Sequence, residues 1–156
     1  APSSLLFYIG FDKKIKNVFK EGAITSEFIG NSIRKHQSKT TIGAHNIFLG
    51  QVRADIIENK TVVAIEYSAY EDMANEKFDA IREATFKKFD LTCMHIYHSL
   101  GAVNAGEICL FVFASSTRRK IVFKAIEYIV EEIKAHVPVF GKEIFEDDTH
   151  QWKTNK

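Results

Sequence analysis

The chain has 156 residues, 46% of them hydrophobic and 26% charged, and its 21 Lys and Arg against 20 Asp and Glu leave a net charge of +1. These values predict one compact globular domain over residues 1–156 with a substantial core. They exclude a general nucleic-acid binder, which normally carries a marked basic excess. Apolar runs fall short of the ~18 residues that cross a bilayer, so we expect no membrane association either.

Two features predict a cytoplasmic location. The apolar run near the N-terminus follows no basic segment, so it is a poor signal peptide. Cys93 and Cys109 each lie inside an apolar, strand-like run. Thiols in such positions are typical of small core residues in a reducing compartment, not of a disulfide framework.

A strand and a helix are expected in the first 40 residues. Leu5–Phe11 has the apolar composition of a strand. Thr25 or Ser26 is a typical helix N-cap, and the helix should run to about Lys35. The residues expected on its inner face are Phe28, Ile29 and Ile33.

Two strands are expected next. Residues 42–52 are apolar and rich in β-forming residues, which favours a buried strand. Residues 61–69 alternate in polarity, which places Val63, Ile65 and Tyr67 on one face. We expect this second strand to lie beside the first.

The second half of the chain contains two longer amphipathic segments. Residues 72–89 predict a helix whose apolar stripe is Ala74, Phe78, Ile81 and Thr85. Residues 115–137 predict another, with the stripe Val122, Ala125, Ile126, Ile129 and Ile133. Strands are expected at 91–98 and 107–114, and a strand pair at 142–153 around Asp147 and Asp148. Several connections are too short for crossover helices, so we expect an α+β fold with a mixed, mostly antiparallel sheet packed against helices.

The helix predicted at 115–137 has basic residues at both ends. Ser115 or Ser116 can cap its first turn, where Arg118 and Arg119 oppose the helix dipole. A bound anion, held by free backbone N–H groups and two guanidinium groups, would compensate for this opposition. A solvated surface is the alternative interpretation. Lys134 and Lys142 add cations near the other end.

Other motifs lack what their chemistry requires. Residues 101–106 have the spacing of a phosphate loop, but Glu107 stands in place of its lysine, so a turn is expected. His95 and His98 are three residues apart on a strand and therefore point to opposite faces. The other histidines are scattered along the chain, so we expect no metal site. The sequence also offers no convincing nucleophile of its own.

Five segments, taken in order, are similar to one known family. They are GAHNIFLGQVR at 43–53, AIEYSAYEDMANEKF at 64–78, HSLGAV at 98–103, SSTRRK at 115–120, and EEIKAHVPVFGKEIFEDD at 131–148, which Trp152 and Lys153 follow. Together they resemble the molybdopterin synthase large (catalytic) subunit family over residues 43–153. Residues 1–42 match only as a strand–helix lead-in. The resemblance implies an α/β hammerhead-like fold in a single domain.

The resemblance also implies a reaction. Members of this family convert cyclic pyranopterin monophosphate to molybdopterin, and the sulfur comes from a thiocarboxylate on the C-terminal Gly-Gly of a small ubiquitin-like subunit. The large subunit forms a homodimer within a heterotetramer and needs no cofactor. A partner that brings the nucleophile would explain why the sequence lacks one. The alternative is a non-catalytic homologue that binds the small subunit or an anionic ligand without sulfur transfer.

The resemblance implies a set of site residues. The substrate-binding candidates are Gln51, Val52, Arg53, Arg118, Arg119, Lys134, Gly141, Lys142 and Glu143. Lys134 and Lys142 are the catalytic candidates. Two positions depart from the family pattern: Arg118 stands where a histidine is usual, and Gly141 where a basic residue is usual. Lys142 is expected to replace the missing basic residue if the glycine redirects the backbone. Otherwise catalysis rests more heavily on Lys134.

The spacing of the basic residues predicts a composite site. Lys134 follows Arg119 by 15 residues on one helix, which at about 1.5 Å per residue separates them by roughly 22 Å. One pterin phosphate cannot contact both. We expect Arg53 and Lys134 of one subunit to meet Arg118 and Arg119 of a two-fold partner.

Overall fold

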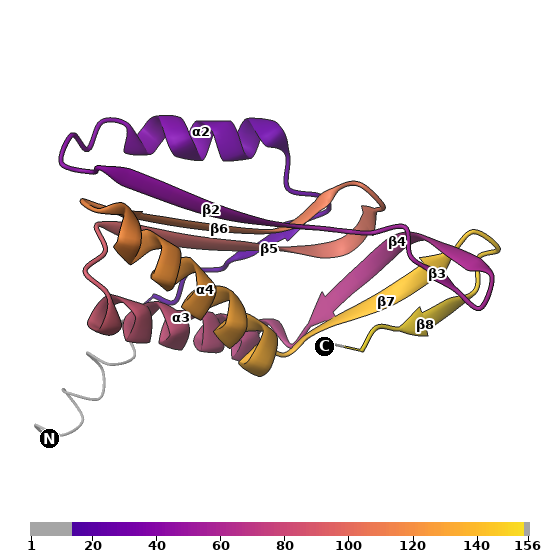
Figure 1. Cartoon of the computed structure of the whole chain (residues 1–156). Helices are drawn as coiled ribbons and strands as arrows, with labels where there is room; N and C mark the ends of the chain where they lie inside the picture. The colour runs from indigo at the N-terminus through magenta and orange to yellow at the C-terminus, as the bar shows by residue number, and fades with distance from the viewer. Residues whose placement is uncertain (1–13, 155–156) are drawn as a thin grey trace, which may run out of the picture.

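The structure is a computed structural model that describes residues 14–154. The strand expected at Leu5–Phe11 lies outside the described residues. The sheet has one helix, α2 (Ser26–His36), on one face, and two helices, α3 (Glu71–Lys88) and α4 (Arg119–His136), on the other (Figure 1). This α+β architecture confirms the expected fold class.

The sheet is open and largely antiparallel. Its main path, in spatial order, is β2 (Ala44–Gln51), β6 (Ile108–Ser116), β5 (Cys93–Asn104), β4 (Lys60–Ala69), β7 (Val139–Phe145) and β8 (His150–Trp152). The short β1 (Phe19–Glu21) pairs in parallel with β5, and β3 (Ile56–Ile57) pairs with β4. The long strand β5 pairs with β6 through residues 93–98 and with β4 through residues 101–104. It therefore joins the two parts of the sheet.

Three expectations about the strands are wrong. β4 does not lie beside β2, because β6 and β5 lie between them, and β2 is a half-buried edge strand. In β4, a register shift between Val62 and Ala64 interrupts the alternation. Val63 is consequently exposed while Ile65 is buried, so the two do not share an environment.

The helices follow their predicted patterns. Thr25 caps α2 because its Oγ1 accepts a hydrogen bond from the Phe28 N–H at 3.1 Å. The buried residues of α3 are Ala74, Phe78, Ile81 and Thr85, and those of α4 are Val122, Ala125, Ile126, Ile129 and Ile133. Both stripes are as predicted. They form the main core with the inner face of the sheet.

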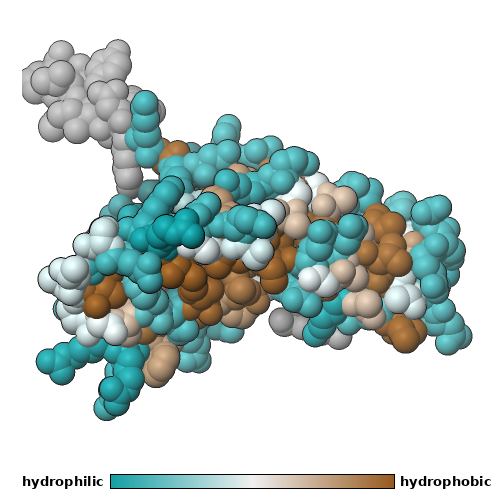
Figure 2. All heavy atoms as spheres, turned by 90° about the horizontal axis from the view of Figure 1, so that it is seen from above, coloured by the Kyte–Doolittle hydropathy of each residue, from teal (hydrophilic) through white to brown (hydrophobic). Residues whose placement is uncertain are grey.

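A second, smaller core lies under α2. It consists of Ile24, Phe111 and Phe113, against which Phe28, Ile29 and Ile33 of the helix pack. Seen from the α2 side, hydrophilic side chains predominate over this helix, and apolar patches lie beside it (Figure 2). Within the described residues, no helix is both long and apolar enough to cross a membrane.

The structure shows the two turns that the sequence predicts, one near residues 147–148 and one within residues 101–106. The chain turns at 147–148 between β7 and β8, with Asp148 at φ +66°, which confirms the strand pair. In the segment 101–106, the first four residues extend β5 and only 105–106 form the turn. This segment therefore joins two antiparallel strands, and it has no helix to follow it as a phosphate loop would require.

Candidate functional site

The N-terminus of α4 opens into a basic hollow. Arg118 is the N-cap residue, and the helix begins with Arg119, Lys120 and Ile121. These residues, together with Thr117 and Gly43, line an open hollow of about 510 Å³. A Cβ built on Gly43 would lie 2.2 Å from the Thr117 carbonyl oxygen, so a side chain cannot fit there. The close approach of these two backbones shapes the hollow.

The expected serine cap is wrong. Ser115 and Ser116 are fully buried in β6. The Ser116 hydroxyl donates to the Asp90 carbonyl at 2.8 Å, and Ser115 Oγ lies 2.7 Å from His45 Nδ1. Both hydroxyl groups therefore have partners away from the first turn of α4. Among the described residues, no side chain caps the first turn of α4, which leaves its N–H groups available to an anion.

The other cations gather at the opposite end of α4. β2 and β6 are antiparallel, and their register joins Ala44 to Ser116 at one end and Gln51 to Ile108 at the other. α4 starts beyond Ser116 and runs back across these strands (Figure 1). Its last turn, with Lys134, therefore lies toward the end of β2 from which Arg53 emerges. Arg118 and Arg119 lie at the far end.

The three residues after Gly50 differ in their exposure. Gln51 is exposed, Val52 is 1% exposed, and the Arg53 side chain is 72% exposed. The Arg53 guanidinium pairs with the Asp55 carboxylate, with Nε 3.2 Å from Oδ1 and Nη2 3.3 Å from Oδ2. An exposed pair of this kind contributes little stability. A phosphate could therefore compete for the same guanidinium group.

The strand β7 presents its residues to two opposite faces. Gly141 lies opposite Tyr67, and a Cβ at this glycine would be 3.4 Å from Tyr67 Cε1. Lys142 lies opposite Glu66, and its Nζ is 3.4 Å from Glu66 Oε1 and 5.9 Å from the centre of the Trp152 ring. Because strand residues alternate, the Lys142 side chain points away from the face that Gly141 shares with Tyr67.

The face shared by Gly141 and Tyr67 is partly buried and carries polar groups. Glu143 is 5% exposed and accepts a hydrogen bond from Gln151 Nε2 at 3.1 Å. Burial raises the pKa of the Tyr67 hydroxyl, and the neighbouring Cys109 thiol and Glu143 carboxylate add to this effect. The Tyr67 ring also packs edge-on against His98, with ring centres 5.1 Å apart.

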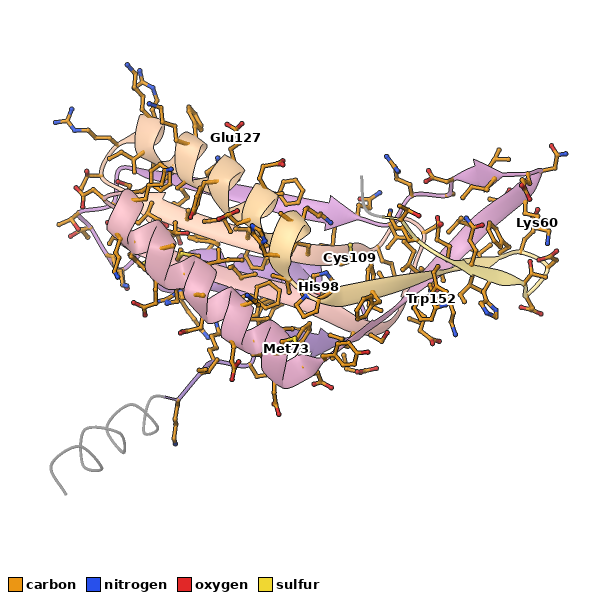
Figure 3. The ribbon with its side chains drawn as sticks, turned by 90° about the horizontal axis from the view of Figure 1, so that it is seen from below. Lys60, Met73, His98, Cys109, Glu127 and Trp152 are labelled. Carbon is orange, nitrogen blue, oxygen red and sulfur yellow. The ribbon has the colours of Figure 1, made fainter. Side chains whose placement is uncertain are left out.

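His98 belongs to this face, although sequence reasoning considered it only as a metal ligand. Figure 3 places His98 and Cys109 near the C-terminal end of α4, where β7 begins. Burial is the main cause that lowers the pKa of His98 to about 4; the bond to the Ser99 carbonyl opposes this shift, and the Lys134 charge adds to it. The sequence contains one signal for the burial of His98. Met94, Ile96 and His98 are two residues apart on one strand, so His98 lies on the same face as these two buried residues.

His95 lies on the opposite face, as its spacing from His98 predicts. The histidines are nevertheless less scattered than the sequence suggests, because His36 Nε2 of α2 lies 2.8 Å from His95 Nε2. Among the described residues, no group of three His, Cys, Asp or Glu side chains could hold a metal ion. Cys93 and Cys109 are both buried free thiols.

The fold and the arrangement of basic residues define an α+β protein with a largely antiparallel sheet and cations at both ends of one core helix. The family model described as MoaE protein matches residues 24–136. The chain belongs to this family, whose curated members include molybdopterin synthase catalytic subunits.

Individual relatives support this assignment. The chain is 30% identical to the Bos taurus molybdopterin synthase catalytic subunit over 93% of its own length and 75% of the relative. It is 38% identical to that of Drosophila willistoni over 73% of its length and 31% of the relative. The corresponding rat protein is covered over 56% of its length. The chain thus spans less than two thirds of some relatives that it matches.

Solved structures have the same fold. Molybdopterin synthase from Staphylococcus aureus superimposes with a TM-score of 0.77 and 30% identity, over 90% of this chain and 99% of that chain. A complex of subunits 1 and 2 of molybdopterin-converting factor from Helicobacter pylori superimposes with a TM-score of 0.74 and 18% identity, over 89% and 92%.

Proposed function

We propose that this chain is the sulfur-transferring catalytic subunit of a molybdopterin synthase. It converts cyclic pyranopterin monophosphate to molybdopterin with sulfur from the C-terminal thiocarboxylate of a small ubiquitin-like subunit. The observation that carries this proposal is the placement of cations at the two ends of α4 in a chain of this family. The buried free thiols fit a reducing, cytoplasmic compartment and a sulfur that comes from a partner.

The basic residues divide the work between binding and chemistry. Arg118, Arg119 and the free N–H groups of the first turn of α4 hold the substrate phosphate, since guanidinium groups bind such anions bidentately. Lys134 stabilises negative charge as the thiocarboxylate sulfur attacks the pterin and forms a thioester. It does so again as water hydrolyses the C–S bond of this thioester, which leaves the sulfur on the pterin and a carboxylate on the small subunit. The side chain of Lys142 points to the other face and pairs with Glu66, so this assignment rests the chemistry on Lys134.

The distance along α4 implies a composite site. Arg119 and Lys134 are at opposite ends of this 18-residue helix, roughly 22 Å apart at about 1.5 Å per residue. A homodimer would bring Arg53 and Lys134 of one subunit to Arg118 and Arg119 of its partner. Such a dimer, with one small subunit at each end, forms a heterotetramer.

Mixed dimers test the composite site. Arg119→Ala and Lys134→Ala proteins should each be nearly inactive alone. After unfolding and refolding together, half of the dimers are mixed, and each mixed dimer has one of its two sites intact. Random mixing should therefore restore about one quarter of wild-type activity. Mixtures that stay as inactive as their components would contradict the composite site.

The alternative of a non-catalytic homologue has one observation in its favour. Gly141 supplies no cation, and the adjoining Lys142 points to the other face of β7. A sulfur-transfer assay with a thiocarboxylated small subunit and cyclic pyranopterin monophosphate separates the two functions. Formation of the dithiolene product supports the enzyme. Tight binding of the small subunit without product would support the binding protein.

A further inference from the structure

His98 is a buried imidazole for which the proposed function has no use so far. It is 5% exposed and packs edge-on against the rings of Phe19 and Tyr67, whose centres are 6.2 and 5.1 Å from its own. Its Nδ1 is 2.8 Å from the Ser99 carbonyl oxygen. A carbonyl can only accept, so Nδ1 carries the proton and the lone pair is on Nε2. Within residues 14–154, the structure gives Nε2 no hydrogen-bond partner.

The surroundings keep this imidazole uncharged. Burial lowers the pKa of His98 to about 4, so the ring is neutral at physiological pH. The charge of Lys134 contributes to this lowering, which requires the ammonium group to be close enough to interact. Figure 3 places His98 beside the end of α4 that carries Lys134. A neutral acceptor therefore lies near the end of α4 that carries the proposed catalytic cation.

We propose that His98 is the positioning residue of Lys134: its Nε2 accepts a hydrogen bond from the Lys134 ammonium group once substrate is bound. This inference rests on the proposed function. Lys134 is exposed and has a flexible four-carbon stem, so its charge needs a fixed partner to be useful. A carboxylate in this place would compete with the anionic substrate for the ammonium group. A neutral imidazole fixes the ammonium group without cancelling its charge.

The first test replaces the imidazole. His98→Leu should lower the maximal rate of sulfur transfer about 10- to 100-fold, the size expected for one hydrogen bond to a charged group, with KM nearly unchanged. His98→Gln keeps an acceptor and should recover most of the rate. His95→Leu is the matched control, because it changes the same residue type on the same strand but on the opposite face. It should leave the rate unchanged.

The second test asks whether the effect passes through Lys134. In a Lys134→Ala background, His98→Leu should cause no further loss, since the partner of the hydrogen bond is already missing. Equal losses in both backgrounds would overturn the inference. A loss of the same size in His98→Gln as in His98→Leu would also overturn it.

An NMR measurement separates this inference from the proposed function. The ring ¹⁵N signal of His98 Nε2 should move upfield when cyclic pyranopterin monophosphate is added to wild-type protein, and should not move in Lys134→Ala. Turnover without this shift overturns the inference and leaves the function standing. A shift without turnover contradicts the proposed function and supports only the hydrogen bond between His98 and Lys134. This measurement also decides the matter if His98→Leu fails to fold.

Discussion

Gly43 is a lining residue of the basic hollow at which a side chain does not fit. A Cβ at this position would lie 2.2 Å from the Thr117 oxygen and 3.1 Å from the Thr117 carbonyl carbon. Both are backbone atoms, so a rotamer change cannot relieve the contact. Any side chain must instead push the 117–121 segment away from β2, and with it the N–H groups at the start of α4.

Gly43→Ala should therefore reduce both stability and anion binding. We expect a loss of about 2 kcal/mol in the free energy of unfolding, as for other overpacked sites, and a clear rise in KM for the pterin phosphate. Urea unfolding and steady-state kinetics measure the two effects. Gly30→Ala is the control, because its Cβ meets nothing within 4 Å in α2. It should stabilise the protein by about 0.5–1 kcal/mol, since alanine favours the helix. Equal stability of the two variants would contradict the predicted contact.

Sequence reasoning identified the basic residues but not what surrounds them. Lys134 could be placed at the end of a helix because helical periodicity is local. The idea that Lys142 replaces the missing cation at Gly141 remains a prediction, and strand alternation together with the Glu66 pair gives it no support. His98 was missed as a site residue because its importance depends on α4 and β4, which are distant in sequence.

At the scale of elements, α2 is held to the sheet by a pair of imidazoles as well as by apolar contacts. His36 Nδ1 lies 2.6 Å from the Ser32 carbonyl oxygen and so carries a proton. In the neutral ring, His36 Nε2 then accepts from His95 Nε2 at 2.8 Å. Burial lowers the pKa of His95 to about 4, and the charges of Lys16, of His36 when it is protonated, and of Arg82 and Lys39 add to this.

This pair predicts a loss of stability in mild acid. The unfolded state takes up a proton near the ordinary histidine pKa of 6.5, whereas folded His95 does so only near 4. Stability is therefore full above about pH 6.5 and falls as the pH drops toward 4. The His95 contribution should be about 1 kcal/mol between pH 7 and 5.5. His98, whose pKa is also lowered to about 4, should add a loss in the same direction.

Urea unfolding at pH 7 and pH 5.5 measures this loss. His95→Leu should remove its share of the pH dependence. His150→Gln, at an exposed position in β8, should keep the dependence of the wild type. An unchanged pH dependence in His95→Leu would show that other groups dominate.

The elements themselves show why prediction succeeded for helices and failed for strand order. The stripes of α3 and α4 follow from spacings of three and four residues within each helix. The neighbours of β4 in the sheet are β5 and β7, and both are distant from β4 in the sequence. The local pattern of residues in β4 therefore cannot predict which strands it pairs with. The serine cap failed because β6 continues through Ser115 and Ser116, whose hydroxyl groups then bond to other parts of the fold.

At the scale of the whole molecule, β5 is the strand that joins the two parts of the sheet. It pairs with β6 over residues 93–98, with β1 over residues 98–100 and with β4 over residues 101–104. Met94, Ile96 and Val103 of this strand are fully or nearly fully buried in the main core. Neither part of the sheet can therefore separate without breaking the strand that both share, and we expect a single cooperative unfolding transition.

The two thiols report on this cooperativity. Cys93 and Cys109 are 5% and 8% exposed, so both should resist a thiol reagent in the native protein. With increasing urea, both should become reactive over the same range in which the circular dichroism signal is lost. Single variants Cys93→Ala and Cys109→Ala assign each thiol. Labelling of one thiol at clearly lower urea would indicate that part of the sheet opens first.

The length of α4 limits which insertions and deletions this protein can tolerate. One rigid helix carries both groups of cations, so the number of its residues sets their separation and their relative direction. One inserted residue would lengthen the helix by about 1.5 Å and turn everything beyond it by about 100°. In a dimer with composite sites, that change would reach two active sites at once. The turn at 105–106 is free of this constraint, since it lies outside the helix. If the composite site is correct, we expect α4 to tolerate substitutions away from its buried stripe and its terminal cations, but not a change in its number of residues.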